Sequence, residues 1–136
     1  LPLLPDGGMI TGKVGENLGV EEGARAARQV GLNVLATVRE SLGSLDRVER
    51  VIKLGAFVNC TADFTDQPKV ANGASELMQA LFGEAGRHAR SAVGVAHAIL
   101  MRMPALEWAL RGRDGAAAGR GDGGRRAGAQ RGALIN

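Results

Sequence analysis

The sequence predicts an α+β domain, because two segments with helical periodicity alternate with two short apolar segments typical of strands. A chain of 136 residues can bury one hydrophobic core and is short for two. Beyond residue 110 the composition changes to mostly Gly, Ala and Arg, which offers too little apolar surface to order a backbone. We therefore expect one domain over residues 1–110 and a disordered tail over residues 111–136.

The first helix is expected to begin at Val20 and to end before Gly43, a residue type that commonly stops helices. Its apolar residues recur at spacings of three and four, with arginines on the opposite face. This apolar stripe consists of Ala24, Ala27, Val30, Gly31, Val34, Leu35, Val38 and Leu42. The preceding segment, residues 9–19, is glycine-rich and irregular, which predicts a loop.

The first strand is expected between residues 47 and 59, where the side chains alternate with a period of two. Its purely apolar face, which we expect to be buried, consists of Ile52, Leu54, Ala56 and Val58. The second strand is expected over residues 91–96. Residues 97–110 cluster further apolar side chains and predict a short helix, interrupted at Pro104.

The second helix is expected to start at Asp66 as N-cap, with Pro68 in its first turn, and to close at Phe82 and Gly83. Its apolar residues again recur with helical spacing. We expect a buried stripe of Val70, Ala74, Leu77, Met78 and Leu81.

Charge and composition limit the kinds of partner that the chain is expected to bind. The formal net charge of +3 comes from the tail, where six arginines stand against two aspartates, while the rest of the chain has eleven basic and twelve acidic residues. Aromatic residues make up 3%, with no tyrosine, so stacking surfaces for bases are scarce. The chain has no apolar run long enough to span a membrane and no signal-peptide pattern at its start. With one cysteine, it is expected in the reducing cytosol.

Arg90 is the main candidate for a binding residue, in the segment GRHARSAVGV. A guanidinium at the mouth of a small, apolar strand needs an anion, and its planar fork of donors matches a carboxylate bidentately. The alternative, which is the more common one for an arginine taken by itself, is a surface or salt-bridge residue. His88 lies two residues earlier, on the same side of an extended segment, and is a candidate acid or base or a loop histidine with a structural hydrogen bond. Cys60 is either a reactive thiol or a small buried residue. No metal-ligand spacing is present, and no metal or cofactor is expected.

The order helix, strand, helix, strand, together with NCTADF after the first strand and GRHARSAVGV at the second, resembles the YjgF/RidA family. The run FTDQPKVANGASELMQALFGEAGRHARSAVGVA is similar to its endoribonuclease L-PSP-like branch, and the similarity covers about residues 1–96. The resemblance implies a chorismate-mutase-like mixed sheet with two helices on one face. It also implies a homotrimer with ligand clefts between subunits.

The resemblance further implies a function and a set of site residues. Relatives hydrolyse reactive enamines and imines such as 2-aminoacrylate to 2-keto acids and ammonia, without a cofactor. In such a site Arg90 holds the substrate carboxylate, and backbone groups near Ser91, Ala92 and Val93 complete the cleft. Asn72 or Ser75 correspond to a polar residue that lines the cleft in relatives, with simple solvation on the helix surface as the alternative.

The chain departs from the family pattern at both ends. Its start resembles the end of a stretch that normally follows two strands, so this opening pair is expected to be missing. After Ala96 the usual carboxylate-bearing strand is replaced, and we hypothesise a frameshifted or misjoined tail. Glu107 lies near the position of the missing carboxylate, but its setting lacks strand alternation and predicts a solvated residue on a helical or irregular segment.

The sequence and the resemblance together leave three candidate functions. The first is enamine and imine deamination. The second is a non-catalytic, metabolite-binding regulatory trimer, which the absent carboxylate strand favours. The third is an endoribonuclease or translation inhibitor, for which Arg87, Arg90, Arg50 and Lys53 would have to form an RNA surface. We expect a small imino or keto acid ligand rather than nucleic acid or a membrane.

Overall fold

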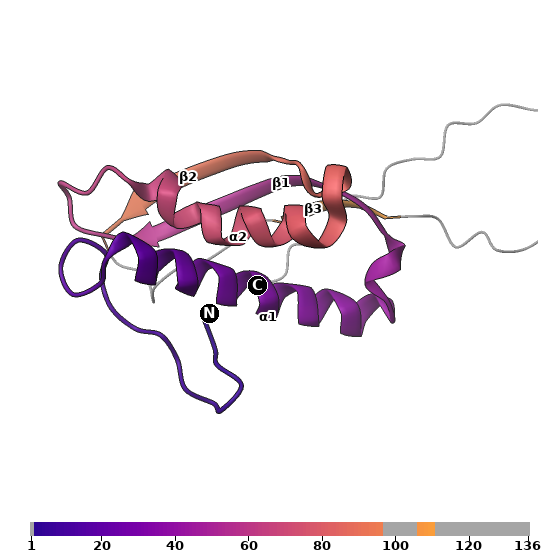
Figure 1. Cartoon of the computed structure of the whole chain (residues 1–136), viewed down its shortest axis with the longest axis horizontal. Helices are drawn as coiled ribbons and strands as arrows, with labels where there is room; N and C mark the ends of the chain where they lie inside the picture. Colours follow the sequence, from indigo (N-terminus) through magenta and orange to yellow (C-terminus); the bar gives the residue numbers. More distant parts are fainter. Residues whose placement is uncertain (1, 97–105, 111–136) are drawn as a thin grey trace, which may run out of the picture.

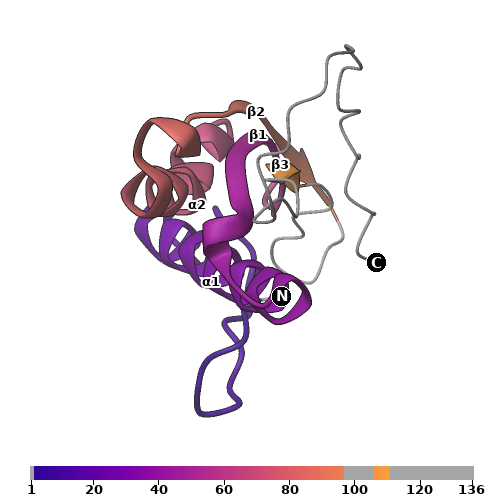
Figure 2. The ribbon, with the colours of Figure 1, turned by 90° about the vertical axis from the view of Figure 1, so that its right-hand side faces the viewer.

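The computed structural model describes residues 2–96 and 106–110 (Figure 1). Two helices, α1 (Val20–Leu42) and α2 (Gln67–Phe82), pack against each other and cover one face of a sheet, as the end-on view in Figure 2 shows. The sheet has the strand order β2-β1-β3. The expected α+β class, a mixed sheet with two helices on one face, is confirmed. The proposed tail, residues 111–136, lies outside the described residues.

Helix α1 has the bounds that the sequence predicts. The carboxylate of Glu22 accepts a hydrogen bond of 2.8 Å from the Gly19 backbone N–H at its start. At its end Gly43 adopts a left-handed conformation with φ 81°, and its N–H donates to the Arg39 carbonyl. Most of the predicted stripe is buried, although Ala24, Val34 and Leu42 are only half-buried.

Close contact between the helices depends on glycine. A Cβ added at Gly73 in α2 would lie 1.9 Å from the Ala24 carbonyl oxygen of α1, so only glycine fits at this crossing. Leu77 and Met78 are buried as predicted, whereas the prediction for Leu81 is wrong: it is 48% exposed. It lies in the last turn of α2, two residues before Gly83, where the helix ends.

Strand β1 (Val48–Asn59) follows the 3-10 turn η1 (Leu45–Arg47) and supplies much of the core. Leu54, Ala56 and Val58 are buried as expected, but Ile52 is 45% exposed and Val51 is fully buried instead. The cause is a register irregularity in the pairing of β1 with β3 between Val51 and Lys53. An irregularity of this kind reverses the side-chain alternation on either side of it.

Strand β2 (Ala89–Val95) follows the 3-10 turn η2 (Gly83–Gly86) and pairs parallel to β1. Strand β3 (Leu106–Leu110) pairs antiparallel to the other edge of β1. The expectation of a helix over residues 97–110 is therefore wrong for 106–110, because backbone pairing with β1 outweighs the weak local pattern. Residues 97–105 lie outside the described residues.

The segment before α1 is a loop, as predicted, and Val14 and Gly12 connect it to the end of β1: the Asn59 side-chain amide donates to the Gly12 carbonyl over 3.0 Å. Val14 is 1% exposed and forms a parallel bridge with Cys60, just beyond β1. Its N–H donates to the Asn59 carbonyl over 2.9 Å, and its carbonyl accepts from the Thr61 N–H over 3.0 Å. The buried valine, with both of its backbone groups paired, thus helps to tie the loop to the core.

Candidate functional site

Arg90 is the second residue of β2 and is paired with Leu54 of β1. Paired residues of neighbouring strands project from the same face, so Arg90 projects toward the helices, as the buried Leu54 does. The residue is nevertheless exposed, because β2 lies at an edge of the described sheet. An arginine on the helix-covered face of an edge strand can reach both α2 and solvent.

Helix α2 supplies two polar partners to this guanidinium. Nη1 of Arg90 donates to Asn72 Oδ1 over 2.7 Å and to Ser75 Oγ over 3.1 Å. Asn72 and Ser75 are three residues apart and therefore neighbours on one helix face. Ser75 is 6% exposed and belongs to the same turn as the buried Ala71 and Ala74, which fix the helix against the core. Both acceptors are neutral groups, so neither hydrogen bond neutralises the positive charge of the arginine.

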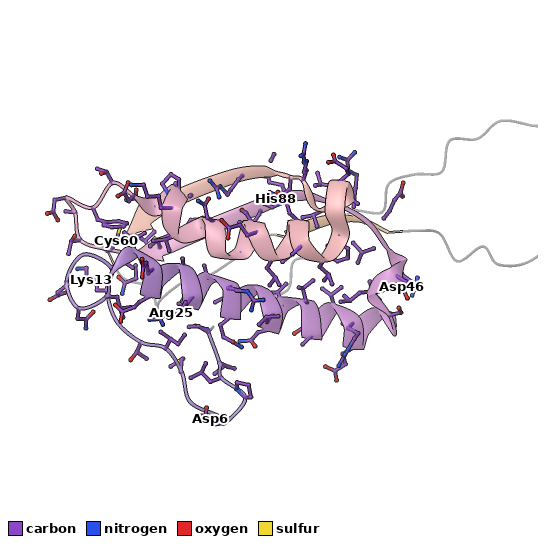
Figure 3. All side chains as sticks on the ribbon, in the orientation of Figure 1. Asp6, Lys13, Arg25, Asp46, Cys60 and His88 are labelled. Carbon is purple, nitrogen blue, oxygen red and sulfur yellow. The ribbon has the colours of Figure 1, made fainter. Side chains whose placement is uncertain are left out.

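His88 completes the cluster from the loop before β2 (Figure 3). Its Nδ1 lies 2.6 Å from the Gly86 carbonyl oxygen, and its Nε2 lies 3.1 Å from Ser75 Oγ. A carbonyl only accepts, so Nδ1 carries a proton, and in the neutral ring Nε2 accepts the hydroxyl proton of Ser75. Ser75 thus accepts from Arg90 and donates to His88. The result is a continuous chain of hydrogen bonds from the guanidinium to a backbone carbonyl.

Gly86 is a site residue that the sequence reasoning missed. A Cβ at this position would lie 2.1 Å from the backbone carbonyl oxygen of Met78 in α2. The loop therefore touches the helix backbone directly, and this contact sets the position of the carbonyl that orients His88. The only sequence signal is the glycine at the head of GRHARSAVGV, which has no helical or strand role of its own.

The structure brings together four predicted site residues: Asn72, Ser75, His88 and Arg90. The other three, Ser91, Ala92 and Val93, follow Arg90 along β2. Ala92 packs against the core, whereas Val93 is 44% exposed, and strand alternation puts it with Ser91 on the face away from the helices. A role for their backbone groups stays a prediction, supported by the position of β2 at the edge of the described sheet.

Cys60 lies apart from this cluster. It is 5% exposed just beyond the end of β1 and is approached by the Gln67 amide at 3.6 Å. His88 precedes Ala89, which is paired with Lys53 in the middle of β1, and Figure 3 shows the two labelled residues well separated. Burial against the core supports the reading of Cys60 as a small buried residue.

Glu107 lies within β3, which corrects the expectation of a helical or irregular segment. Its Cα partner is Lys53 of β1, and Lys53 is paired on its other side with Ala89, the residue before Arg90. The strand register thus places Glu107 and Arg90 on opposite sides of β1, offset by one residue.

The basic residues considered for an RNA surface do not share one face. Arg90 projects toward the helices, whereas Lys53, one register position away, projects from the other face. Arg87 is paired with Glu84 at 3.3 Å on the exposed turn η2. Within residues 2–96 no group of three or more His, Cys, Asp or Glu side chains could hold a metal ion, and no helix is long and apolar enough to cross a membrane.

One carboxyl away from the cluster has a perturbed pKa. The Thr61 hydroxyl and, to a smaller extent, the backbone N–H of Asp63 donate to the Asp63 carboxylate and lower its pKa. Asp63 lies in the connection between β1 and α2, so this interaction stabilises the turn there.

These observations define the class of protein: a two-layer α+β domain whose arginine, on an edge strand, is held by neutral polar groups of a helix. Residues 1–104 match the family described as "YjgF/chorismate mutase-like, putative endoribonuclease". The chain belongs to this family, which confirms the resemblance drawn from the sequence.

Similar proteins support the same assignment. Protein TCP17 of Trypanosoma cruzi is 54% identical over 97 residues, which are 71% of this chain and 61% of that protein. This chain therefore spans about 61% of the curated relative that it matches. The crystal structure of Atu1372 from Agrobacterium tumefaciens, a protein of unknown function, is 41% identical with a TM-score of 0.70, covering 74% of this chain and 67% of that one. A putative endoribonuclease from Shewanella oneidensis MR-1 is 32% identical, also with a TM-score of 0.70, covering 74% and 68%.

Proposed function

We propose that this domain binds small imino and keto acids through their carboxylate at Arg90, and hydrolyses reactive enamines and imines to 2-keto acids and ammonia. The observation that carries the proposal is the set of partners around Arg90. Both hydrogen-bond acceptors that the described residues give it, Asn72 and Ser75, are neutral. A guanidinium without an acidic partner keeps its full charge for an anionic ligand.

The reaction needs little chemistry from the protein. Water adds to the imine carbon, the resulting carbinolamine loses ammonia, and the C=O bond of the keto acid forms. A carboxylate held bidentately fixes the adjacent carbon in place, so orientation and charge stabilisation supply the rate enhancement.

A direct test uses 2-aminoacrylate generated in the assay by a pyridoxal-phosphate-dependent enzyme. Ammonia release should rise above the spontaneous rate with wild-type protein, and Arg90→Ala should lower kcat/KM by about 100-fold, the loss of two charge-assisted hydrogen bonds. Arg87→Ala is the matched control, because Arg87 is paired with Glu84 rather than with the cluster. Turnover by Arg90→Ala at the wild-type rate would refute the proposal.

Asn72→Asp tests the neutrality of the site with almost no change in shape. It places a carboxylate 2.7 Å from Nη1 and so gives Arg90 an internal anion. We expect affinity for pyruvate to fall at least tenfold, because the ligand now meets a like charge. The free energy of unfolding should stay the same or rise. Unchanged pyruvate affinity would argue against carboxylate recognition at Arg90.

We further propose that the domain is a homotrimer of the cytosol and that its open sheet face forms the subunit contact. Ile52 and Val93 are 45% and 44% exposed on the strands of this face. Exposed aliphatic side chains on an uncovered sheet favour burial against a partner. Light scattering after size-exclusion chromatography should give a trimer mass, and Ile52→Lys should shift it to the monomer. A monomeric wild type would contradict this assembly.

Two other functions remain testable in the same preparations. Binding of pyruvate without turnover of 2-aminoacrylate would favour a regulatory binding protein. The family description and the Shewanella relative favour RNA cleavage, which predicts RNA degradation by highly purified protein that is lost in Arg90→Ala. The separation of Arg90 and Lys53 onto opposite faces counts against an RNA surface.

A further inference from the structure

We propose that Ser75 and His88 are positioning residues that direct one edge of the Arg90 guanidinium toward the ligand. This inference rests on the proposed function and adds the way in which the carboxylate is received. In this arrangement the ligand binds to the Nε and Nη2 edge of Arg90. A planar monocarboxylate fits this edge, because each of its two oxygens can accept from one of these nitrogens.

As a first step, the N–H groups of Arg90 show which edge is open to a ligand. A guanidinium has five N–H groups, two of them on Nη1. Asn72 Oδ1 and Ser75 Oγ accept from Nη1 at 2.7 and 3.1 Å, so this nitrogen has one acceptor for each of its two hydrogens. Within the described part of the chain, no acceptor is bonded to Nε or Nη2. The end-on pair Nη1/Nη2 is thus blocked, and the side-on pair Nε/Nη2 is the bidentate edge that remains.

The second step concerns the orientation of Ser75. Its hydroxyl oxygen can accept from Arg90 with a well-aligned lone pair only if its proton points elsewhere. The hydroxyl instead donates to His88 Nε2, 3.1 Å away, which is an acceptor because the Gly86 carbonyl, 2.6 Å from Nδ1, fixes the ring and its neutral tautomer. The histidine therefore fixes the direction of the Ser75 hydroxyl proton, and the Ser75 oxygen in turn fixes the orientation of the guanidinium plane.

The third step is burial. Ser75 is 6% exposed and held in α2 by its buried neighbours, whereas Arg90 is exposed and would otherwise sample many rotamers. Fixing a long side chain before the ligand arrives removes an entropic penalty from binding. Ser75 and His88 act on the ligand only through Arg90.

The test measures pyruvate affinity by calorimetry in the full chain, with pyruvamide as the ligand that lacks the carboxylate. We expect Ser75→Ala and His88→Ala each to raise the Kd by about tenfold, in line with loss of a hydrogen bond to a charged group. The double variant should bind no more weakly than either single one, because both residues act as one unit. His88→Gln should restore affinity to within about threefold, since its side-chain oxygen can accept the Ser75 proton. Glu76→Ala, an exposed change on the same helix, is the control.

A spectroscopic measurement separates positioning from general loss of structure. In wild-type protein the side-chain ¹⁵N signals of Arg90 Nη1 and Nη2 should be distinct, because Nη1 is held by two acceptors. In His88→Ala they should merge through rotation, and in His88→Gln they should separate again, while the amide spectrum stays folded.

The outcomes distinguish this inference from the function on which it rests. If Arg90→Ala abolishes pyruvate binding while Ser75→Ala and His88→Ala bind like wild type, the positioning role is overturned and carboxylate recognition stands. Strictly additive losses in the double variant would also overturn it. If Arg90→Ala binds pyruvate normally, both proposals fall.

Discussion

Gly73→Ala tests the close crossing of α1 and α2, next to Asn72 of the site. A Cβ at residue 73 would lie 1.9 Å from the Ala24 carbonyl oxygen and 2.7 Å from its carbon. Real Cβ contacts essentially never fall below 3.0 Å, so α1 and α2 must separate by about 1.1 Å at this point. The obstacle is backbone, which has no rotamer to move into.

The expected size of the effect follows from two opposing terms. Overpacking against a rigid neighbour destabilises by about 3 kcal/mol, the upper end of the usual range. Replacing a helical glycine by alanine stabilises by about 1 kcal/mol. We therefore expect a net loss of about 2 kcal/mol, which corresponds to a fall in Tm of roughly 8–16 °C for a domain of this size.

Urea unfolding followed by circular dichroism, together with a thermal scan, measures this change. Ala36→Gly is the control, because Ala36 is exposed in α1 and reports helix propensity alone, with an expected loss of about 1 kcal/mol. If Gly73→Ala proves as stable as the wild type, or more stable, then the helices do not touch at this residue and the reasoning about the crossing is wrong.

Three further predictions concern other parts of the molecule. Thr61→Val should raise the pKa of Asp63 toward its ordinary value in an NMR titration. The lowered pKa provides a small stabilisation that is present at neutral pH and lost as the pH falls through that pKa, and this stabilisation should disappear in the variant. An unchanged titration would contradict the Thr61 hydrogen bond. Val51→Ala should lower the free energy of unfolding in urea by about 2 kcal/mol, whereas Ile52→Ala should change the monomer's stability by less than about 0.5 kcal/mol. If Ile52→Ala were instead the more destabilising change, Ile52 rather than Val51 would be the buried residue, as simple strand alternation predicts. Gly86→Ala should push the loop away from α2 and weaken pyruvate binding about as much as His88→Ala does, and normal affinity would show that the Gly86 carbonyl does not orient the histidine.

The sequence by itself determined the two helices and the family, and it singled out Arg90 as the candidate binding residue. The bounds of α1 follow from its apolar stripe and from Gly43, because amphipathic periodicity and a left-handed stop are local properties. Arg90 is singled out by the GRHARSAVGV motif and the family resemblance rather than by its own chemistry, since an arginine at a strand end is more often a surface or salt-bridge residue; its role in binding a ligand stays a prediction. The family follows from the same segment and is confirmed over residues 1–104.

Only the tertiary structure decided which neighbours Arg90 has. Asn72 and Ser75 reach it because β2 lies parallel to β1 and beside α2, a contact that no local pattern encodes. The same holds for the exposure of Ile52, which follows from an irregularity in strand pairing, and for β3, which forms because β1 offers it an edge. Long-range backbone pairing outweighs local preference in these last two places. The family resemblance named Asn72, Ser75 and His88 as candidates, but only the tertiary structure shows that they contact one another and Arg90.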